Sequence, residues 1–224
     1  MSGDVDPLPR IAILGGTGQQ GGGIAQRLAR SGRRITIGSR DAARAASTVG
    51  KWPFPAGSFE ATDYARAAAS ADVVVLAVPF AAVDALLDEC RDHFRPNALV
   101  VDVIVPLTFE SGGVRMTAVD EGSAAEHIKA RLPAHARLAA TFKTVPARLL
   151  NEIDRPLECD EFVAGDSAES RSEAASLVTA LGGLRPVDVG PLRFVRSIEH
   201  LTLLAIAINR RHHLHDARFR VVGL

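Results

Sequence analysis

Short apolar runs and longer amphipathic segments alternate along this chain, which predicts strands and helices in turn. The first run, residues 11–14, is entirely apolar and ends in glycines, as a buried parallel strand does. Residues 72–78 form the clearest strand, because their β-branched side chains are apolar on both faces until Pro79 ends the run. Further strands are predicted at residues 34–38, 98–103, 137–142, 162–165 and 185–189.

Helical periodicity fills most of the intervals between these strands. The first predicted helix follows the glycines after residue 14 and ends at Gly32, and Asp41 is the expected N-cap of the second. A loop is expected between Pro106 and Ser123. The alternation predicts an α/β fold, a Rossmann-type doubly wound, mostly parallel sheet with a short C-terminal helical extension. The later helices are predicted over residues 41–49, 62–69, 81–90, 123–132, 167–181 and 198–209.

Composition narrows the class of protein. Of 224 residues, 47% are hydrophobic, and the 26 basic residues balance 26 acidic ones, which favours a globular domain and gives no support for nucleic-acid binding. The longest apolar stretch near the end, Leu201 to Ile208, is too short to span a bilayer. The N-terminus has no apolar run of signal-peptide length, and the two cysteines form no CxxC pair. We therefore expect a cytoplasmic protein with one domain over residues 1–224, its extension beginning near residue 183.

A glycine-rich hexapeptide joins the first strand to the first helix. The first glycine of the pattern allows a tight turn, and the second allows the close approach of a pyrophosphate. The third allows the helix to pack closely on the strand. The helix N-terminus also directs free N–H groups at phosphates. Because the pattern lies between a strand and a helix, it predicts a dinucleotide-binding loop. The hexapeptide is Gly16, Thr17, Gly18, Gln19, Gln20 and Gly21.

The end of the second predicted strand indicates which dinucleotide binds. NAD-binding domains place an acidic residue there for the ribose 2′-hydroxyl. This chain has Ser39 and Arg40 instead, and Arg44 lies one helical turn further on. Guanidinium groups pair with phosphate oxygens in bidentate fashion, so these residues predict NADP(H).

Taken together, several segments resemble the NADPH-dependent reductases of the deazaflavin coenzyme F420. The glycine loop and the Gly-Ser-Arg segment match the family. Val-Pro-Phe is similar to its Ile-Pro-Trp, and Thr-Val-Pro-Ala to its Thr-Ile-Pro-Ala. The matches keep the family's order over nearly the whole chain: residues 15–18, 38–40, 78–80, 144–147 and 188–192, then Arg196, Glu199, Leu201 and Thr202.

The resemblance implies a homodimer that transfers a hydride directly between nicotinamide C4 and deazaflavin C5. It implies that NADP(H) is the cofactor and coenzyme F420 the co-substrate. Stacking and orientation then matter more than acid–base groups. The implied contacts to the 2′-phosphate are Thr17, Ser39, Arg40 and Arg44, and those to the pyrophosphate are Gly18, Gln19 and Gln20. The implied walls of the hydride-transfer cleft are Val78, Pro79, Phe80, Thr144, Val145 and Pro146.

Three departures from the family fall where the hydride partner is expected. Lys143 stands where the family often has histidine, Phe80 replaces a tryptophan, and the sequence of residues 102–106 differs from the one usual in the family. The other hypotheses are therefore an NADPH-dependent reductase of another acceptor, such as a flavin, an imine or a ketone, and a non-catalytic NADP-sensing module.

Side chains near these segments allow two interpretations each. The Lys143 ammonium either faces an anionic acceptor, in a possible catalytic role, or reaches solvent from the strand end. Arg196 and Glu199 lie at helical spacing, which predicts a mutual ion pair or a place at a subunit interface. The four histidines at 200, 212, 213 and 215 lack a carboxylate pattern and are interspersed with arginines, so no metal site is expected.

Overall fold

The computed structural model describes residues 8–111 and 113–224 of the chain. Eight strands form one sheet in the order β10-β9-β8-β5-β4-β1-β2-β3. Neighbouring strands pair in parallel, except for antiparallel β8 and β9. The predicted Rossmann-type, mostly parallel sheet is confirmed. Its strands are β1 (Ile11–Leu14), β2 (Ile35–Gly38), β3 (Phe59–Thr62), β4 (Val73–Leu76), β5 (Leu99–Asp102), β8 (Arg137–Ala140), β9 (Cys159–Gly165) and β10 (Leu184–Gly190).

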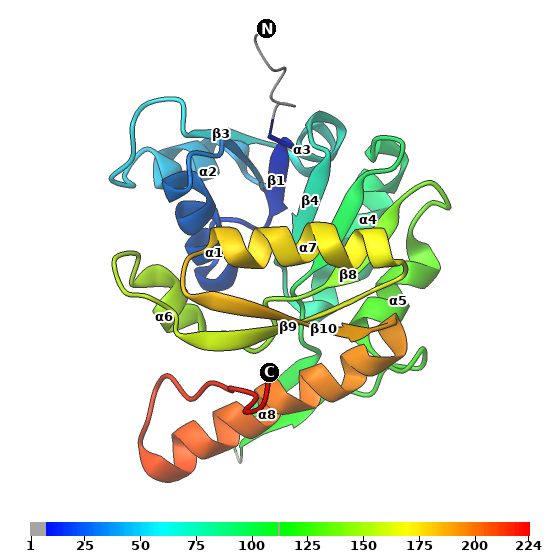
Figure 1. The fold of residues 1–224 in the computed structure, drawn as a ribbon. Coiled ribbons are helices and arrows are strands. Elements are labelled where there is room, and N and C mark those ends of the chain that lie inside the picture. The colour runs from blue at the N-terminus through cyan, green and yellow to red at the C-terminus, as the bar shows by residue number, and fades with distance from the viewer. Residues whose placement is uncertain (1–7, 112) are drawn as a thin grey trace, which may run out of the picture.

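Helices cover both faces of this sheet (Figure 1). Because side chains alternate along a strand, Ile11 and Ile13 join one apolar cluster and Ala12 and Leu14 the other. Burial on both faces explains why the central strands are continuous apolar runs. The first cluster contains residues of α1 (Gln19–Arg30), α2 (Ala42–Val49), α6 (Ala147–Asn151) and α7 (Ala168–Ala180), and the second those of α3 (Tyr64–Ser70), α4 (Val83–Cys90), α5 (Ala124–Arg131) and the start of α8 (Val195–His212).

Short polar side chains begin several of these helices where the sequence places them. The Asp41 carboxylate accepts a hydrogen bond from the Arg44 amide, which confirms the predicted cap of α2. Asp63, Ser123 and Ser167 cap α3, α5 and α7 in the same way. Within residues 8–111 and 113–224, no helix has both the length and the apolar character that a membrane crossing requires.

Three regions differ from the prediction. The short helix α6 was not predicted. The helix expected over residues 62–69 begins later, because residues 59–62 form edge strand β3 and Asp63 then caps α3. The loop expected after Pro106 is wrong: β6 (Leu107–Glu110) and β7 (Gly113–Met116) pair as an antiparallel hairpin. Both segments are short and only partly buried, so they lack the continuous apolar run that identifies the central strands.

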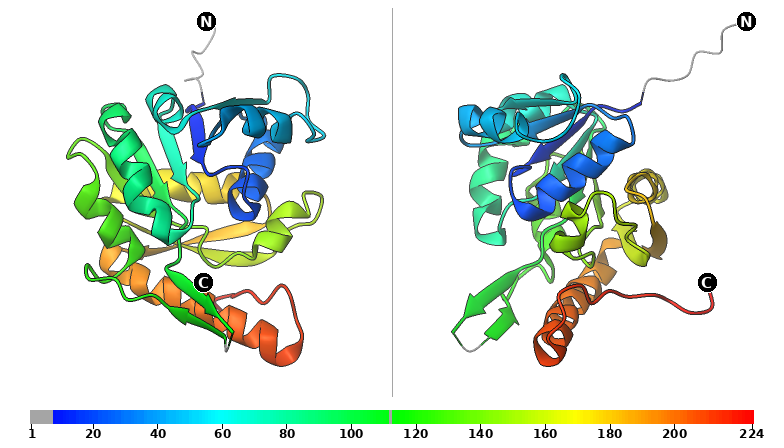
Figure 2. Two further views of the ribbon diagram at one scale, coloured as in Figure 1. Left: turned by 180° about the vertical axis from the view of Figure 1, so that it is seen from behind. Right: turned by 90° about the vertical axis from the view of Figure 1, so that its left-hand side faces the viewer.

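The hairpin and α8 lie together at one end of the molecule, beyond the edge of the helix-covered sheet (Figures 1 and 2). Strand β7 packs against α8, and α8 extends from the predicted residues 198–209 to Val195–His212. Strand β10, which begins the expected extension, is an edge strand of the main sheet.

Candidate active site

The glycine loop brings β1 close to the end of β4. Gly15 has a φ of +86°, and a Cβ atom there would lie 2.6 Å from the Ala77 carbonyl oxygen. A Cβ on Gly21 would lie 2.9 Å from the carbonyl oxygen of Gly15, so helix α1 packs on the loop only because that residue is glycine. The loop therefore has the geometry that its sequence pattern predicts.

The N-cap residue of helix α1 is Gly18, which has no side chain to cap the helix. Its first N–H groups are available to an anion, and the positive end of the helix dipole favours one. The side chain of Gln20 is already engaged, since Nε2 donates to the Phe142 carbonyl at 2.7 Å. Any contact of Gln20 with a pyrophosphate would thus come from its backbone N–H.

A cavity of about 390 Å³ opens beside this loop. It brings together seven residues that the sequence assigns to the nucleotide, from the glycine loop, the end of β2 and the end of β4. Asp41, Tyr64 and Glu89 also line it, and sequence reasoning missed them as site residues. The seven predicted residues are Thr17, Gly18, Ser39, Arg40, Arg44, Val78 and Pro79.

Arg40 and Arg44 are exposed at the mouth of this cavity. Neither guanidinium belongs to an ion pair among the residues that the structure describes. The nearby Asp41 carboxylate instead caps α2 at 2.9 Å from the Arg44 amide. The Arg40 side chain hydrogen-bonds that of Tyr64. Because neither cation is paired with a carboxylate in the described part of the chain, the two suit a phosphate beside Ser39 better than a hydroxyl.

The remaining predicted residues do not line this cavity. Gly16, Gln19, Gln20 and Gly21 shape the loop and the start of α1 behind it. Thr144 and Val145 are buried at the carboxyl end of β8. Phe80 is half-buried at the end of β4, and its ring lies 5.2 Å from that of His127.

A buried carboxylate hydrogen-bonds both Lys143 and Thr144, just after β8. Glu161, on β9, accepts hydrogen bonds from the Lys143 amide at 2.9 Å and from the Thr144 hydroxyl at 2.8 Å. Burial raises the pKa of Glu161 to about 7, and these hydrogen bonds oppose that shift. Sequence reasoning missed Glu161; its only signal is an acidic residue beside an apolar strand.

The ammonium of Lys143 reaches neither solvent nor an open site. Its side chain has no exposed surface, and Nζ lies 2.7 Å from Asp102 and 3.2 Å from Glu199. The expectation of a solvent-reaching lysine is therefore wrong, because two carboxylates from other elements turn the side chain inward. The predicted pairing of Glu199 with Arg196 is also wrong, because the Glu199 carboxylate pairs with Lys143 instead.

Burial also affects the titration of this cluster. It raises the pKa of Glu199 to about 7, with the Lys143 ammonium opposing the shift. The pKa of Lys143 is raised by its two carboxylate partners, against the effect of its own burial.

A second charged cluster, formed by His127, Asp84, Glu121 and Arg131, lies beside Phe80. The two ring nitrogens of His127 lie 2.8 Å from Asp84 and 2.9 Å from Glu121, so the imidazole donates to both only when it is protonated. Hydrogen bonds from Arg131 and His127 lower the pKa of Glu121 to about 2. This cluster fixes the ring behind Phe80 and was not predicted from sequence.

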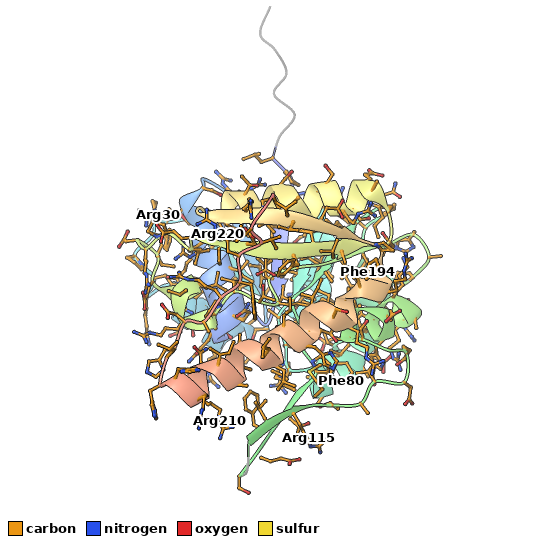
Figure 3. The ribbon with its side chains drawn as sticks, turned by 60° about the horizontal axis from the view of Figure 1, so that its bottom comes forward. Arg30, Phe80, Arg115, Phe194, Arg210 and Arg220 are labelled. Carbon is orange, nitrogen blue, oxygen red and sulfur yellow. The ribbon has the colours of Figure 1, made fainter. Side chains whose placement is uncertain are left out.

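Two cavities, together called the groove, lie between α8 and the hairpin. Its inner end is a cavity of about 240 Å³ that Arg196, Glu199 and His200 line, together with Arg115 and residues 116–119. Its outer end is an open space of about 700 Å³ between Val114 of the hairpin and Leu203, Ala207 and Arg210 of α8. Figure 3 shows Arg115 and Arg210 on its two walls. The groove therefore combines apolar walls with cationic side chains.

No cluster of three or more potential metal-ligating side chains is present in residues 8–111 and 113–224.

The fold and this site define a Rossmann-type dinucleotide-binding oxidoreductase. A family described as "NADP oxidoreductase coenzyme F420-dependent" matches residues 10–106. The F420-dependent NADP reductase of Methanothermobacter thermautotrophicus is 39% identical over 96% of this chain and 95% of its own length. That of Methanocaldococcus jannaschii is 30% identical over 96% of this chain and 99% of its own. The chain belongs to the F420-dependent NADP reductase family.

A solved structure supports the same relationship. A putative F420-dependent NADP reductase from Arthrobacter sp. FB24 superposes with a TM-score of 0.81. It is 27% identical, and the alignment covers 96% of this chain and 99% of that one. The similarity in fold to this structure therefore extends over nearly the whole chain.

Proposed function

We propose that this enzyme transfers a hydride between NADPH and the deazaflavin coenzyme F420. The observation that carries this proposal is the cavity beside the glycine loop, where Ser39, Arg40 and Arg44 meet and no acidic residue stands at the end of β2. The two carboxylates that line the cavity lie elsewhere: Asp41 caps α2, and Glu89 belongs to α4. Family membership supports F420 as the second substrate. In the forward direction, a hydride leaves nicotinamide C4 for deazaflavin C5, and one proton from water balances the reduced ring.

The dinucleotide would lie across the carboxyl ends of the strands. Arg40, Arg44 and Ser39 would hold the 2′-phosphate, with Thr17 beside them. The amides of Gln19 and Gln20 would hold the pyrophosphate, which Gly18 can approach closely although its own amide donates to the Gly15 carbonyl at 3.0 Å. Val78 and Pro79 line the same cavity and would contact the nicotinamide end, with Phe80 beyond them. Thr144 and Val145 would close the far side of the nicotinamide at the end of β8.

The groove between α8 and the hairpin is the proposed place of the acceptor. Its apolar walls suit a planar ring system, and its arginines suit an anionic co-substrate. Glu199, which lines the inner cavity, contacts Lys143 immediately before Thr144. The groove therefore begins where the proposed nicotinamide pocket ends.

The first experiment is an assay of the purified enzyme with NADPH and oxidised F420, following loss of the deazaflavin absorbance. We expect fast reduction with NADPH and much slower reduction with NADH. Arg196→Ala should raise the KM for F420 about 10-fold and leave the KM for NADPH unchanged, because one charge-assisted contact contributes roughly 1.5 kcal/mol. Arg193→Ala, an exposed neighbour outside the groove, is the matched control.

Flavin, imine and ketone acceptors belong in the same assay. Reduction of one of these while F420 stays oxidised would overturn the acceptor assignment and retain the NADPH site. Tight NADPH binding with no reduction of any acceptor would favour the non-catalytic sensing module.

We also infer that the enzyme is a homodimer built on its C-terminal helix. Three large apolar side chains are exposed at this end of the molecule. They are Phe194 just before α8 (42% exposed), Leu204 on α8 (49%) and Phe109 of the hairpin (73%). Covering them in a partner removes that apolar surface from water. Light scattering should give twice the chain mass of 23.7 kDa, and Leu204→Glu should shift the mass to one chain. A single-chain mass for the unmodified protein at all concentrations would contradict the dimer.

The other expectations about organisation stay predictions. One domain spans residues 1–224, with the extension from about residue 183. A cytoplasmic location agrees with two free, buried thiols, Cys90 and Cys159.

A further inference from the structure

A fully buried ionic cluster joins three elements that are distant in sequence. Lys143 follows β8, Asp102 ends β5, and Glu199 lies on α8. The exposed fractions of the three side chains are 0%, 0% and 1%. The ammonium also donates to the carbonyl of Ile104, so all three of its protons have an acceptor.

The two carboxylates are themselves fixed. The other Asp102 oxygen accepts from the Ile104 amide at 2.8 Å. The Glu199 oxygen that faces Lys143 also accepts from the Ala124 amide, the first residue of α5, at 3.1 Å. A backbone amide therefore fixes the position of each carboxylate that contacts Lys143. A buried ion pair is weak evidence for stability, whereas a unique arrangement is its best-attested use.

The backbone of Lys143 is held from the same directions. Its carbonyl accepts from the Thr202 hydroxyl of α8 at 2.7 Å, and its amide donates to Glu161. The preceding carbonyl, of Phe142, accepts from Gln20 on the dinucleotide-binding helix α1. Side chain and backbone together tie the segment before Thr144 to α1 on one side and to α8 on the other.

We propose that Lys143, with Asp102 and Glu199, is a positioning residue that sets the separation between the nicotinamide at the Thr144–Val145 segment and the acceptor along α8. This role rests on the proposed function. Hydride transfer needs the reacting carbons in near contact, about 3–3.5 Å apart, and a displacement of about 1 Å can lower the rate 100-fold. The cluster touches neither reacting carbon and acts through the two walls that hold them.

Glu199→Gln is the sharpest test, because glutamine keeps the volume and leaves Lys143 paired one-to-one with Asp102. We expect kcat to fall about 10-fold or more, with the KM for NADPH unchanged, because the residues assigned to the 2′-phosphate follow β2 and lie on α2, away from Glu199. The kinetic isotope effect with NADPH deuterated at the transferred position should rise. Glu169→Gln, an exposed carboxylate on α7 that faces Arg137, is the matched control.

Lys143→Arg supplies a rescue test beside Lys143→Met. Arginine keeps the charge and can still bridge the two carboxylates, so it should retain much more of kcat than methionine does. Active-site titration with NADPH should accompany each assay, because a misfolded fraction lowers kcat without changing the isotope effect.

The outcomes separate this role from the function on which it rests. If the unmodified enzyme does not reduce F420, the proposed function fails and the positioning role fails with it. If the unmodified enzyme is active and folded Glu199→Gln matches it in kcat and isotope effect, only the positioning role is overturned. A lower kcat that the titrated loss of active sites fully explains also overturns it.

Discussion

Arg40→Ala is expected to raise the KM for NADPH about 10- to 100-fold while the KM for NADH stays nearly constant. A charge-assisted hydrogen bond to phosphate contributes about 1.5–3 kcal/mol, and each 1.4 kcal/mol corresponds to a factor of ten. Arg40 forms no ion pair among residues 8–111 and 113–224, so its removal leaves no carboxylate without a partner. Steady-state kinetics with both dinucleotides, at one fixed concentration of F420, measure the effect.

The comparison between dinucleotides isolates the 2′-phosphate, since NADH lacks only that group. Arg44→Ala should act in the same direction. Arg66→Ala is the matched control, because this arginine is 81% exposed and pairs locally with Asp63 on α3. An equal rise in KM for NADPH and NADH would contradict the assignment and place Arg40 at the pyrophosphate or in the fold instead.

Arg27→Met is expected to lower the free energy of unfolding by about 3 kcal/mol or more. Arg27 lies on α1, is 4% exposed, and has no carboxylate partner within hydrogen-bonding distance in the described structure. Its guanidinium donates instead to carbonyl oxygens, and burial lowers its pKa. Methionine fills the space but removes all five hydrogen bonds, and among the described residues only the Leu149 and Glu152 carbonyls keep a backbone donor. Leaving buried carbonyls without donors costs more than removal of the buried charge recovers. The acceptors are Leu149, Leu150, Glu152, Arg155 and Leu181.

Urea unfolding followed by circular dichroism measures this loss. Arg30→Met on the same helix is the control, because its ion pair with Asp154 is exposed and such pairs contribute at most about 1 kcal/mol. Arg27→Lys should recover only part of the stability, since one ammonium cannot reach acceptors spread over α6, the segment after it and the end of α7. Equal stability of the Arg27 and Arg30 variants would show that the buried hydrogen bonds contribute nothing net.

The dinucleotide half of the fold follows from local physics. A continuous apolar run is stable as a strand only when both faces are covered, and the glycine pattern after it allows one particular turn. Asp41 satisfies the first amides of α2 three residues away. Interactions of such short range can be recognised in the sequence, which is why the sheet and its central helices could be predicted. For the same reason, the residues that the sequence assigns to the 2′-phosphate line one cavity.

The acceptor half needed the tertiary structure. Strands β6 and β7 of the hairpin are half-exposed, so their sequence pattern does not differ from that of a loop. Lys143 meets Asp102 and Glu199 across 41 and 56 residues, and no local rule states which carboxylates a buried ammonium will reach.

The sequence by itself therefore determined the Rossmann sheet, the dinucleotide loop and the preference for a 2′-phosphate, because each depends on neighbours within a few residues. Only the tertiary structure decided that Lys143 points inward and that α8 and the hairpin enclose a cationic groove. It also decided that Arg27 binds carbonyls at least 122 residues away. Those features depend on which distant elements chain packing brings together, and a buried charge takes whichever partners that packing supplies.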